Sequence, residues 1–206
     1  AMDKSINVVC IHPQNLITKT RYVDDKTNHM FLRVDDGDSA DEIHLSDEFI
    51  NDICESDAVI LSDYDKGFLT EDSIKTICSH AKFSVLDSKK ILSKSIFNSV
   101  DFIKLNEKES LNNIELRDSH NILITLGSRG TSFQNQIFES PNPQETIDVS
   151  GAGDTFTSAF ILKFFETTNI QDSIIWANKM ASIVVSKCCS SKRISFSIPS
   201  DRSVFD

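Results

Sequence analysis

The sequence predicts an α/β protein with a mainly parallel sheet sandwiched by helices and a β-hairpin near the N-terminus. Short apolar runs alternate with amphipathic segments of helical period along most of the 206 residues, which is typical of repeated strand–helix units. A parallel sheet needs helices on both faces, so we expect strands that are buried on both sides. No internal repeat and no Pro/Gly/Ser linker divides the chain, so we expect a single domain over residues 1–206.

The elements can be assigned in order along the chain. Residues 15–35 predict a hairpin, because alternating segments flank the turn formers Asp-Asp-Lys-Thr-Asn. The strands expected after it are residues 57–64, 83–87, 101–106, 121–127 and, at an edge of the sheet, 132–140. Thr70 followed by two acids predicts a capped helix over residues 70–81. Further helices are expected over residues 89–100, 154–168 and 172–188.

Composition excludes several classes of partner. Lys and Arg total 21 against 31 for Asp and Glu, so the net charge of −10 is opposite to that of a nucleic-acid binder. No apolar run approaches the roughly 18 to 20 residues that a membrane-spanning helix needs. The start, Ala1-Met2-Asp3-Lys4, has no signal pattern. We therefore expect a cytoplasmic protein that binds neither nucleic acid nor membrane.

The strongest chemical signal is the segment over residues 148–154, Asp-Val-Ser-Gly-Ala-Gly-Asp, which runs directly into an apolar helix. The small residues Gly151, Ala152 and Gly153 let the backbone approach an anion, at which the free N–H groups of the helix start would point. A carboxylate at Asp154 is placed to take a proton from a hydroxyl that attacks a phosphate. The pattern predicts phosphoryl transfer; the alternative is a plain helix cap with a flexible entry.

The same segment, followed by Thr-Phe-Thr-Ser-Ala-Phe, resembles the C-terminal signature of the ribokinase-like, or PfkB, carbohydrate kinases. In the same order, residues 61–70, 86–89, 104–109 and 124–130 resemble the kinase half of the bacterial ADP-heptose synthases, which phosphorylates a heptose 7-phosphate. The hairpin over residues 15–35 is similar to the lid of that subgroup. The resemblance implies a ribokinase-like fold that uses ATP and Mg²⁺ on a sugar phosphate.

The resemblance also implies roles for particular residues. Asp154 would be the catalytic base, and the three small residues before it the anion hole. The residues that would bind the nucleotide are Asn106, Glu109, Thr125, Gly127, Ser128, Gly130 and Asp148. Asn106 and Glu109 match the Asn-x-x-Glu motif, which organises Mg²⁺ through bound water, so Glu109 would act on the metal through water. The alternatives are a solvated helix start at residues 106–109 and an ordinary turn at residues 125–130.

Charged residues near the hairpin and at one strand end are candidates for contact with the acceptor. Lys19, Arg21 and Arg33 would form a local basic patch in an acidic chain, suited to an anionic sugar phosphate. The alternative is an edge strand kept soluble by charge. Asp63 and Lys66 follow a strand, where they could orient and bind a phosphate or form a surface ion pair. The resemblance further implies a homodimer formed through the lid hairpin.

The sequence therefore predicts an ATP-dependent kinase of a sugar phosphate, similar to heptose 7-phosphate kinases. A hexose, a nucleoside or fructose 6-phosphate are the other acceptors to consider. The family normally begins with several strands and helices, including a Gly-Gly-x-x-x-Asn segment and an early Asp that contact the sugar, and these are not found before the hairpin. The alternative function is thus a truncated, catalytically inactive, nucleotide-binding remnant, whose uncovered sheet edge a partner would cover.

Overall fold

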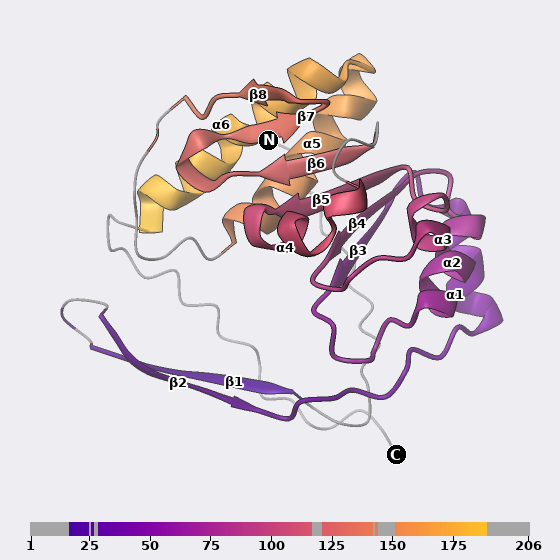
Figure 1. Ribbon diagram of the computed structural model, residues 1–206. Coiled ribbons are helices and arrows are strands. Elements are labelled where there is room, and N and C mark those ends of the chain that lie inside the picture. Colours follow the sequence, from indigo (N-terminus) through magenta and orange to yellow (C-terminus); the bar gives the residue numbers. More distant parts are fainter. Residues whose placement is uncertain are drawn as a thin grey trace, which may run out of the picture.

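A six-stranded sheet forms the body of the protein, and a two-stranded hairpin extends beside it (Figure 1). The computed structural model describes residues 17–24, 26, 29–116, 121–141, 143 and 151–188. In spatial order the strands of the sheet are β3 (Val59–Asp63), β4 (Ser84–Ser88), β5 (Phe102–Asn106), β6 (Ile122–Thr125), β7 (Thr131–Phe133) and β8 (Gln136–Phe138). β3 to β6 are parallel, and β7 and β8 are antiparallel. The predicted mainly parallel sheet is confirmed.

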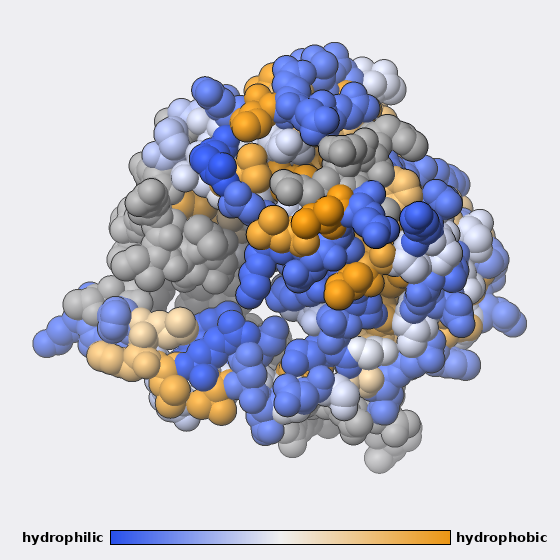
Figure 2. All heavy atoms as spheres, in the orientation of Figure 1, coloured by the Kyte–Doolittle hydropathy of each residue, from blue (hydrophilic) through white to orange (hydrophobic). Residues whose placement is uncertain are grey.

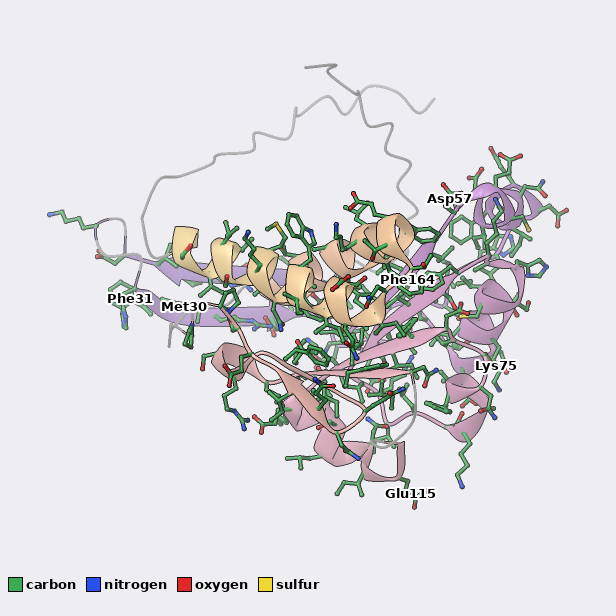
Figure 3. All side chains as sticks on the ribbon, turned by 90° about the horizontal axis from the view of Figure 1, so that it is seen from above. Met30, Phe31, Asp57, Lys75, Glu115 and Phe164 are labelled. Atoms are coloured by element: carbon green, nitrogen blue, oxygen red, sulfur yellow. The ribbon has the colours of Figure 1, made fainter. Side chains whose placement is uncertain are left out.

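Neighbouring residues of the central strands point into two different cores. Val85 packs on one face of the sheet and Leu86 on the other, and Phe102 and Ile103 divide in the same way. The helices α1 (Asp47–Glu55), α2 (Glu71–His80) and α3 (Lys94–Phe97) contribute to the core that holds Leu86. The helices α5 (Ala152–Thr167) and α6 (Ile170–Cys188) form the opposite core. The layers are visible in Figures 1 and 3. Helices on both faces explain why most residues of the central strands β4 and β5 are buried.

Aromatic rings hold α5 against the sheet. Phe160 is fully buried and meets the ring of Phe102 edge-on, with a centroid distance of 5.2 Å. Phe164, labelled in Figure 3, continues this contact one turn further and stacks on Phe83 at 5.3 Å. Burial of each such side chain stabilises the fold by about 1.5–3 kcal/mol. The position of α5 along the sheet is therefore set by these contacts.

Some local predictions are wrong in detail. The helix expected over residues 89–100 is limited to the four residues of α3, because the Leu92 amide donates to Asn113 Oδ1 and Ser93 then caps the helix. The edge strand expected over residues 132–140 is two strands, joined at Gln134 and Asn135, which both have positive φ. The helices α1 and α4 (Glu107–Asn112) are additional to those predicted. Two short 3₁₀ turns, η1 (Ile114–Leu116) and η2 (Gly127–Arg129), complete the elements.

The predicted hairpin is present as β1 (Thr18–Val23) and β2 (Met30–Asp36). Nearly all of its residues are exposed. The segment after it is tied to the loop that follows β3, since the Ala40 amide donates to the Lys66 carbonyl and the Ile43 amide to the Phe68 carbonyl. Among the residues that the structure describes, none of the helices has the length and apolar character required to cross a bilayer.

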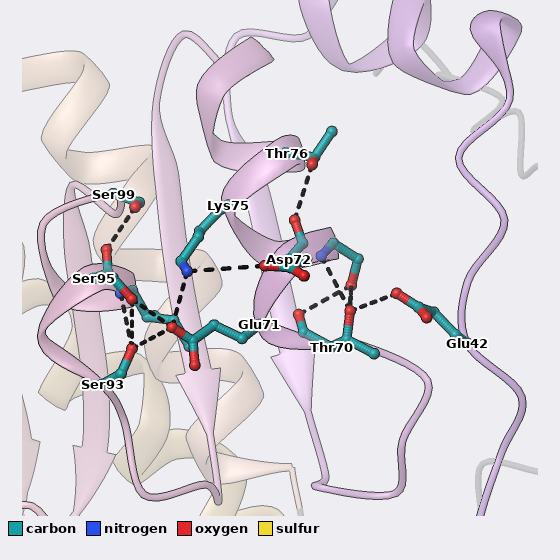
Figure 4. Close-up of polar contacts among 11 residues, drawn as sticks. Glu42, Thr70, Glu71, Asp72, Lys75, Thr76, Ser93, Ser95 and Ser99 are labelled. Carbon is teal, nitrogen blue, oxygen red and sulfur yellow. Dashed lines mark hydrogen bonds and ion pairs between the residues drawn. The ribbon is translucent and has the colours of Figure 1, made fainter.

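The start of α2 joins three segments through polar contacts (Figure 4). The predicted cap is confirmed: Thr70 Oγ1 accepts from the Ser73 amide at 3.2 Å, and Ser73 Oγ accepts from the Thr70 amide at 2.8 Å. The adjacent Glu71 carboxylate accepts hydrogen bonds from the hydroxyls of Ser93 and Ser95 and pairs with Lys75 at 3.0 Å. These hydrogen bonds lower the pKa of Glu71 to about 2.

We expect Glu71→Gln to lower the thermal stability of the protein near neutral pH. The pKa of Glu71 is lower in the folded chain than its ordinary value of 4.5, so its contribution is present above about pH 4.5 and is lost as the pH falls toward 2. The difference in melting temperature between wild type and variant should therefore shrink over that range. Asp72→Asn is the control, because it removes a charge from the same helical turn without touching either serine. Equal pH profiles for both variants would contradict the assignment.

Candidate active site

The predicted site residues meet at the edge of the sheet where the parallel strands end. The last residues of β3, β5 and β6 are Asp63, Asn106 and Thr125, so all three lie at the carboxyl ends of parallel strands. Two cavities open there, a larger one of about 730 Å³ and a smaller one of about 170 Å³. Asn106 and Gly153 line both of them. The two cavities are therefore neighbours that share a wall at the start of α5.

The larger cavity is lined by apolar side chains and by the turn over residues 125–130. Leu126, Phe156 and Val185 contribute apolar surface from three different elements. The predicted nucleotide-binding residues that line it are Asn106, Thr125, Gly127, Ser128 and Gly130. Gly130 is required by the geometry: its φ is +95°, and a Cβ atom there would lie 2.0 Å from the Phe138 carbonyl oxygen. Such a cavity suits a flat, partly apolar ligand with a polar end.

The first turn of α5 begins with a left-handed glycine. Gly151 has φ +79°, and the first intrahelical bond runs from the Thr155 amide to the Gly151 carbonyl at 2.9 Å. Among the described residues, no acceptor is bonded to the amides of Ala152, Gly153 and Asp154. The exposed Asp154 side chain lines the smaller cavity. Asp148, which opens the motif, lies outside the described residues.

The Asn-x-x-Glu motif forms the cap of α4. Asn106 Oδ1 accepts from the Glu109 amide at 2.8 Å, and Glu109 Oε2 accepts from the Asn106 amide at 2.7 Å. Both residues line the smaller cavity, and Glu109 is buried. The described part of the chain holds no cluster of three His, Cys, Asp or Glu side chains suited to a metal. A single carboxylate fits Mg²⁺ that keeps most of its water.

The other two strand-end candidates have partners within the protein. Asp63 is buried, and its carboxylate accepts from Ser88 Oγ at 2.8 Å, from the Asp65 amide at 3.0 Å and pairs with Lys90 at 3.1 Å. Asp63 lines the smaller cavity. Lys66 pairs with Asp38 at 3.2 Å and lines neither cavity. The protein therefore places Asp63, but not Lys66, at the cavity wall.

The hairpin cations differ in their surroundings. Lys19 Nζ lies 4.5 Å from the ring centroid of Tyr64, and Lys89 Nζ lies 4.1 Å from the centroid of the same ring. Arg33 makes two 2.7 Å hydrogen bonds to Asp35 on the same strand, and Arg21 is its cross-strand neighbour. Lys19 thus contacts an aromatic ring on the body of the protein directly.

Sequence reasoning assigned no role to several residues at this edge, among them Tyr64, Asp87, Lys89 and Lys104. Tyr64 and Lys89 line the smaller cavity, directly after β3 and β4. Lys104 lines both cavities from β5. Its signal in the sequence is a cation in the middle of the apolar strand Phe-Ile-Lys-Leu-Asn, which is unusual for a buried strand. Tyr64 and Lys89 carry no comparable local signal, because only the fold brings them together.

This arrangement of strands and helices is similar to the fold of ribokinases. The ribokinase of Thermotoga maritima superimposes with a TM-score of 0.58 at 20% identity, covering 82% of this chain and 62% of that one. The Arabidopsis thaliana ribokinase complexed with ribose and ATP superimposes with a TM-score of 0.56 at 19% identity, covering 69% and 54%. These likenesses establish the fold.

The family follows from the sequence. Residues 5–192 match the pfkB family of carbohydrate kinases, so the chain belongs to that family. It is 33% identical over 208 residues to the bifunctional protein HldE of Helicobacter pylori (strain ATCC 700392 / 26695), covering 84% of this chain and 45% of the relative. The chain spans less than half the length of the curated relatives that it matches. The predicted family resemblance is confirmed.

Proposed function

We propose that this chain transfers the γ-phosphoryl group of ATP to a hydroxyl of a sugar phosphate, with Asp154 as the base. The observation that carries the proposal is the position of Asp154: its side chain lines the smaller cavity, beside amides that border the larger one and have no acceptor among the described residues. A nucleotide in the larger cavity would direct its phosphates toward these amides. An acceptor in the smaller cavity would then lie within reach of the Asp154 carboxylate.

The proposed reaction assigns each local feature a task. Asp154 accepts the proton of the acceptor hydroxyl as that oxygen attacks the phosphorus in line. The amides of Ala152 and Gly153 stabilise the charge that spreads over the phosphoryl oxygens. Asn106 and Glu109 would hold Mg²⁺ through water, and the metal would supply charge neutralisation for the phosphates. Leu126 and Phe156 would exclude water from the base of the nucleotide.

The proposed acceptor carries its own phosphate group, for which the Lys19–Tyr64–Lys89 contact provides cations. Burial lowers the pKa of the Lys89 ammonium, and the neighbouring charge of Lys19 lowers it further. An anion beside these two ammonium groups would relieve their repulsion. Similarity to the HldE relatives makes heptose 7-phosphate the acceptor we propose first, in a cytoplasmic reaction where ATP is abundant.

The hairpin provides a surface for the proposed homodimer. Figure 2 shows apolar side chains gathered over it, and Figure 3 places Met30 and Phe31 at its end far from the sheet. The exposed apolar residues of the hairpin are Tyr22, Val23, Met30, Phe31, Leu32 and Val34. Phe31 alone leaves 69% of its surface exposed. A second copy pairing along this ribbon would bury that surface in both chains.

We expect Asp154→Asn to lower kcat by about 10²–10⁴-fold, because the variant cannot accept the proton, while ATP still binds. ADP release with heptose 7-phosphate, fructose 6-phosphate, a hexose and a nucleoside measures turnover, and thermal stabilisation by ATP measures binding. Asp57→Asn is the control, since Asp57 precedes β3 and so lies at the amino ends of the strands, whereas the cavities lie at the carboxyl ends. Unchanged turnover in Asp154→Asn would refute the assignment. ATP binding by the wild type without turnover on any acceptor would favour the inactive remnant.

We expect Lys89→Met to raise KM for a phosphorylated acceptor by about 10- to 100-fold, the value of one charge-assisted hydrogen bond of about 1.5–3 kcal/mol. The KM for the same sugar without its phosphate should not change, because the lost contact is to that phosphate. Lys94→Met, an exposed lysine at the start of α3, is the control. Equal changes in KM for both sugars would show that Lys89 does not bind the acceptor phosphate.

We expect Phe31→Glu to shift the protein from dimer to monomer, since a charge on each chain would be placed in the apolar contact. Sedimentation velocity over a range of concentrations measures the change. Leu162→Glu is the control, because Leu162 is a similarly exposed apolar residue on α5, away from the hairpin. A wild type that sediments as a monomer at all concentrations would exclude the proposed dimer.

A further inference from the structure

Lys104 is a buried cation in the centre of the sheet. Its side chain is 9% exposed, and Nζ lies 2.8 Å from Oδ2 of Asp87, its cross-strand partner on β4. Burying an ammonium in a strand is costly unless it is paired, and even a paired ion is often no more stable than apolar residues in its place. The energetics of the fold therefore do not by themselves explain a lysine at this position.

The ammonium of Lys104 lies against the first turn of α5. A Cβ atom built on Gly153 would be 3.0 Å from Lys104 Nζ, so the absence of a side chain at Gly153 is what permits this approach. The neighbouring amides are those without an acceptor among the described residues. Lys104 thus adds a full positive charge to the group of N–H donors at the helix start.

Lys104 also lies where the two cavities meet. It lines the larger cavity with Thr125 and Ala152, and the smaller one with Asp87 and Asp154. Asp87 lines the smaller cavity only. Within the part of the chain that the structure describes, Asp87 is the single acceptor bonded to Lys104 Nζ, and an ammonium has three donors. Two donors therefore remain for a ligand that reaches across the boundary between the cavities.

We propose that Lys104 is a catalytic residue that binds the phosphoryl group as it passes from nucleotide to acceptor, and that Asp87 is its positioning residue. The inference rests on the proposed function. The acceptor oxygen forms a bond to the γ-phosphorus while the bond from that phosphorus to the β–γ bridging oxygen breaks, and its electron pair leaves with ADP. The acceptor proton goes to Asp154. Lys104 donates hydrogen bonds to the non-bridging oxygens throughout and keeps its proton.

The test compares Lys104→Met, Asp87→Asn and the double variant. Lys104→Met leaves Asp87 as an unpaired carboxylate, so loss of stability alone would not identify the role of the lysine. The double variant removes both charges and should recover much of the melting temperature lost in Lys104→Met. We expect it to keep a kcat about 10²–10³-fold below that of the wild type, because the charge on the transferring group is still missing.

Calorimetric binding provides a readout without turnover. We expect Lys104→Met and the double variant to bind the non-hydrolysable ATP analogue AMP-PNP about 10-fold or more weakly, and AMP with unchanged affinity, because AMP lacks the group that Lys104 contacts. Lys90→Met is the control for loss of a buried pair, since Lys90 pairs with Asp63 but lines neither cavity. It should lose stability without any selective loss of AMP-PNP affinity.

The outcomes separate the two proposals. A wild type that neither binds AMP-PNP nor turns over an acceptor overturns the proposed function, and the role of Lys104 with it. If the wild type binds AMP-PNP and turns over an acceptor, two results would overturn the role of Lys104 alone. One is a double variant with the same kcat as the wild type, and the other is an equal loss of affinity for AMP-PNP and for AMP. Recovery of stability in the double variant without recovery of kcat or AMP-PNP affinity supports it.

Discussion

The parallel alignment of β3, β4, β5 and β6 is the constraint on which the rest of the molecule depends. Parallel strands can be stable only with both faces covered, which is why alternate residues such as Val85 and Leu86 enter different cores. The same alignment directs all four carboxyl ends to one edge, so the polar groups that end the strands are gathered without any long loop. The packing requirement and the location of the site therefore have a single cause.

Apolar packing also determines how the charged groups of the site meet. Phe102 and Lys104 are two residues apart on β5 and share a face, while Gly153 and Phe160 are seven residues apart on α5 and share a face as well. The contact of Phe102 with Phe160 therefore places Lys104 against Gly153. The ammonium approaches the first amides of the helix because two rings further along hold the helix at that position.

The sequence predicted those features that depend on local patterns. The cap at Thr70 and the helix after Gly153 are encoded in neighbouring residues, and both are present. The helix expected over residues 89–100 is wrong because the Lys89 amide donates to the Asp63 carbonyl and the Leu92 amide to Asn113 Oδ1, and both acceptors are distant in sequence. The sequence did not predict a role for Tyr64 and Lys89 for the same reason, because the two residues meet only when β3 and β4 pair. The roles assigned to Asp154, Asn106 and Glu109 remain predictions.

Charge acts at two scales in this protein. The net charge of −10 opposes the approach of anions, but such repulsion is screened beyond about 8 Å at physiological ionic strength. Closer to the cavities, Lys89 and Lys104 line the walls, and Lys19 of β1 contacts Tyr64, which lines the smaller cavity. Two of them, Lys19 and Lys89, contact the same Tyr64 ring, and burial and the charge of Lys19 disfavour the ammonium of Lys89 and lower its pKa. In the proposed function, an acceptor phosphate beside both ammonium groups would offset the repulsion between them at short range.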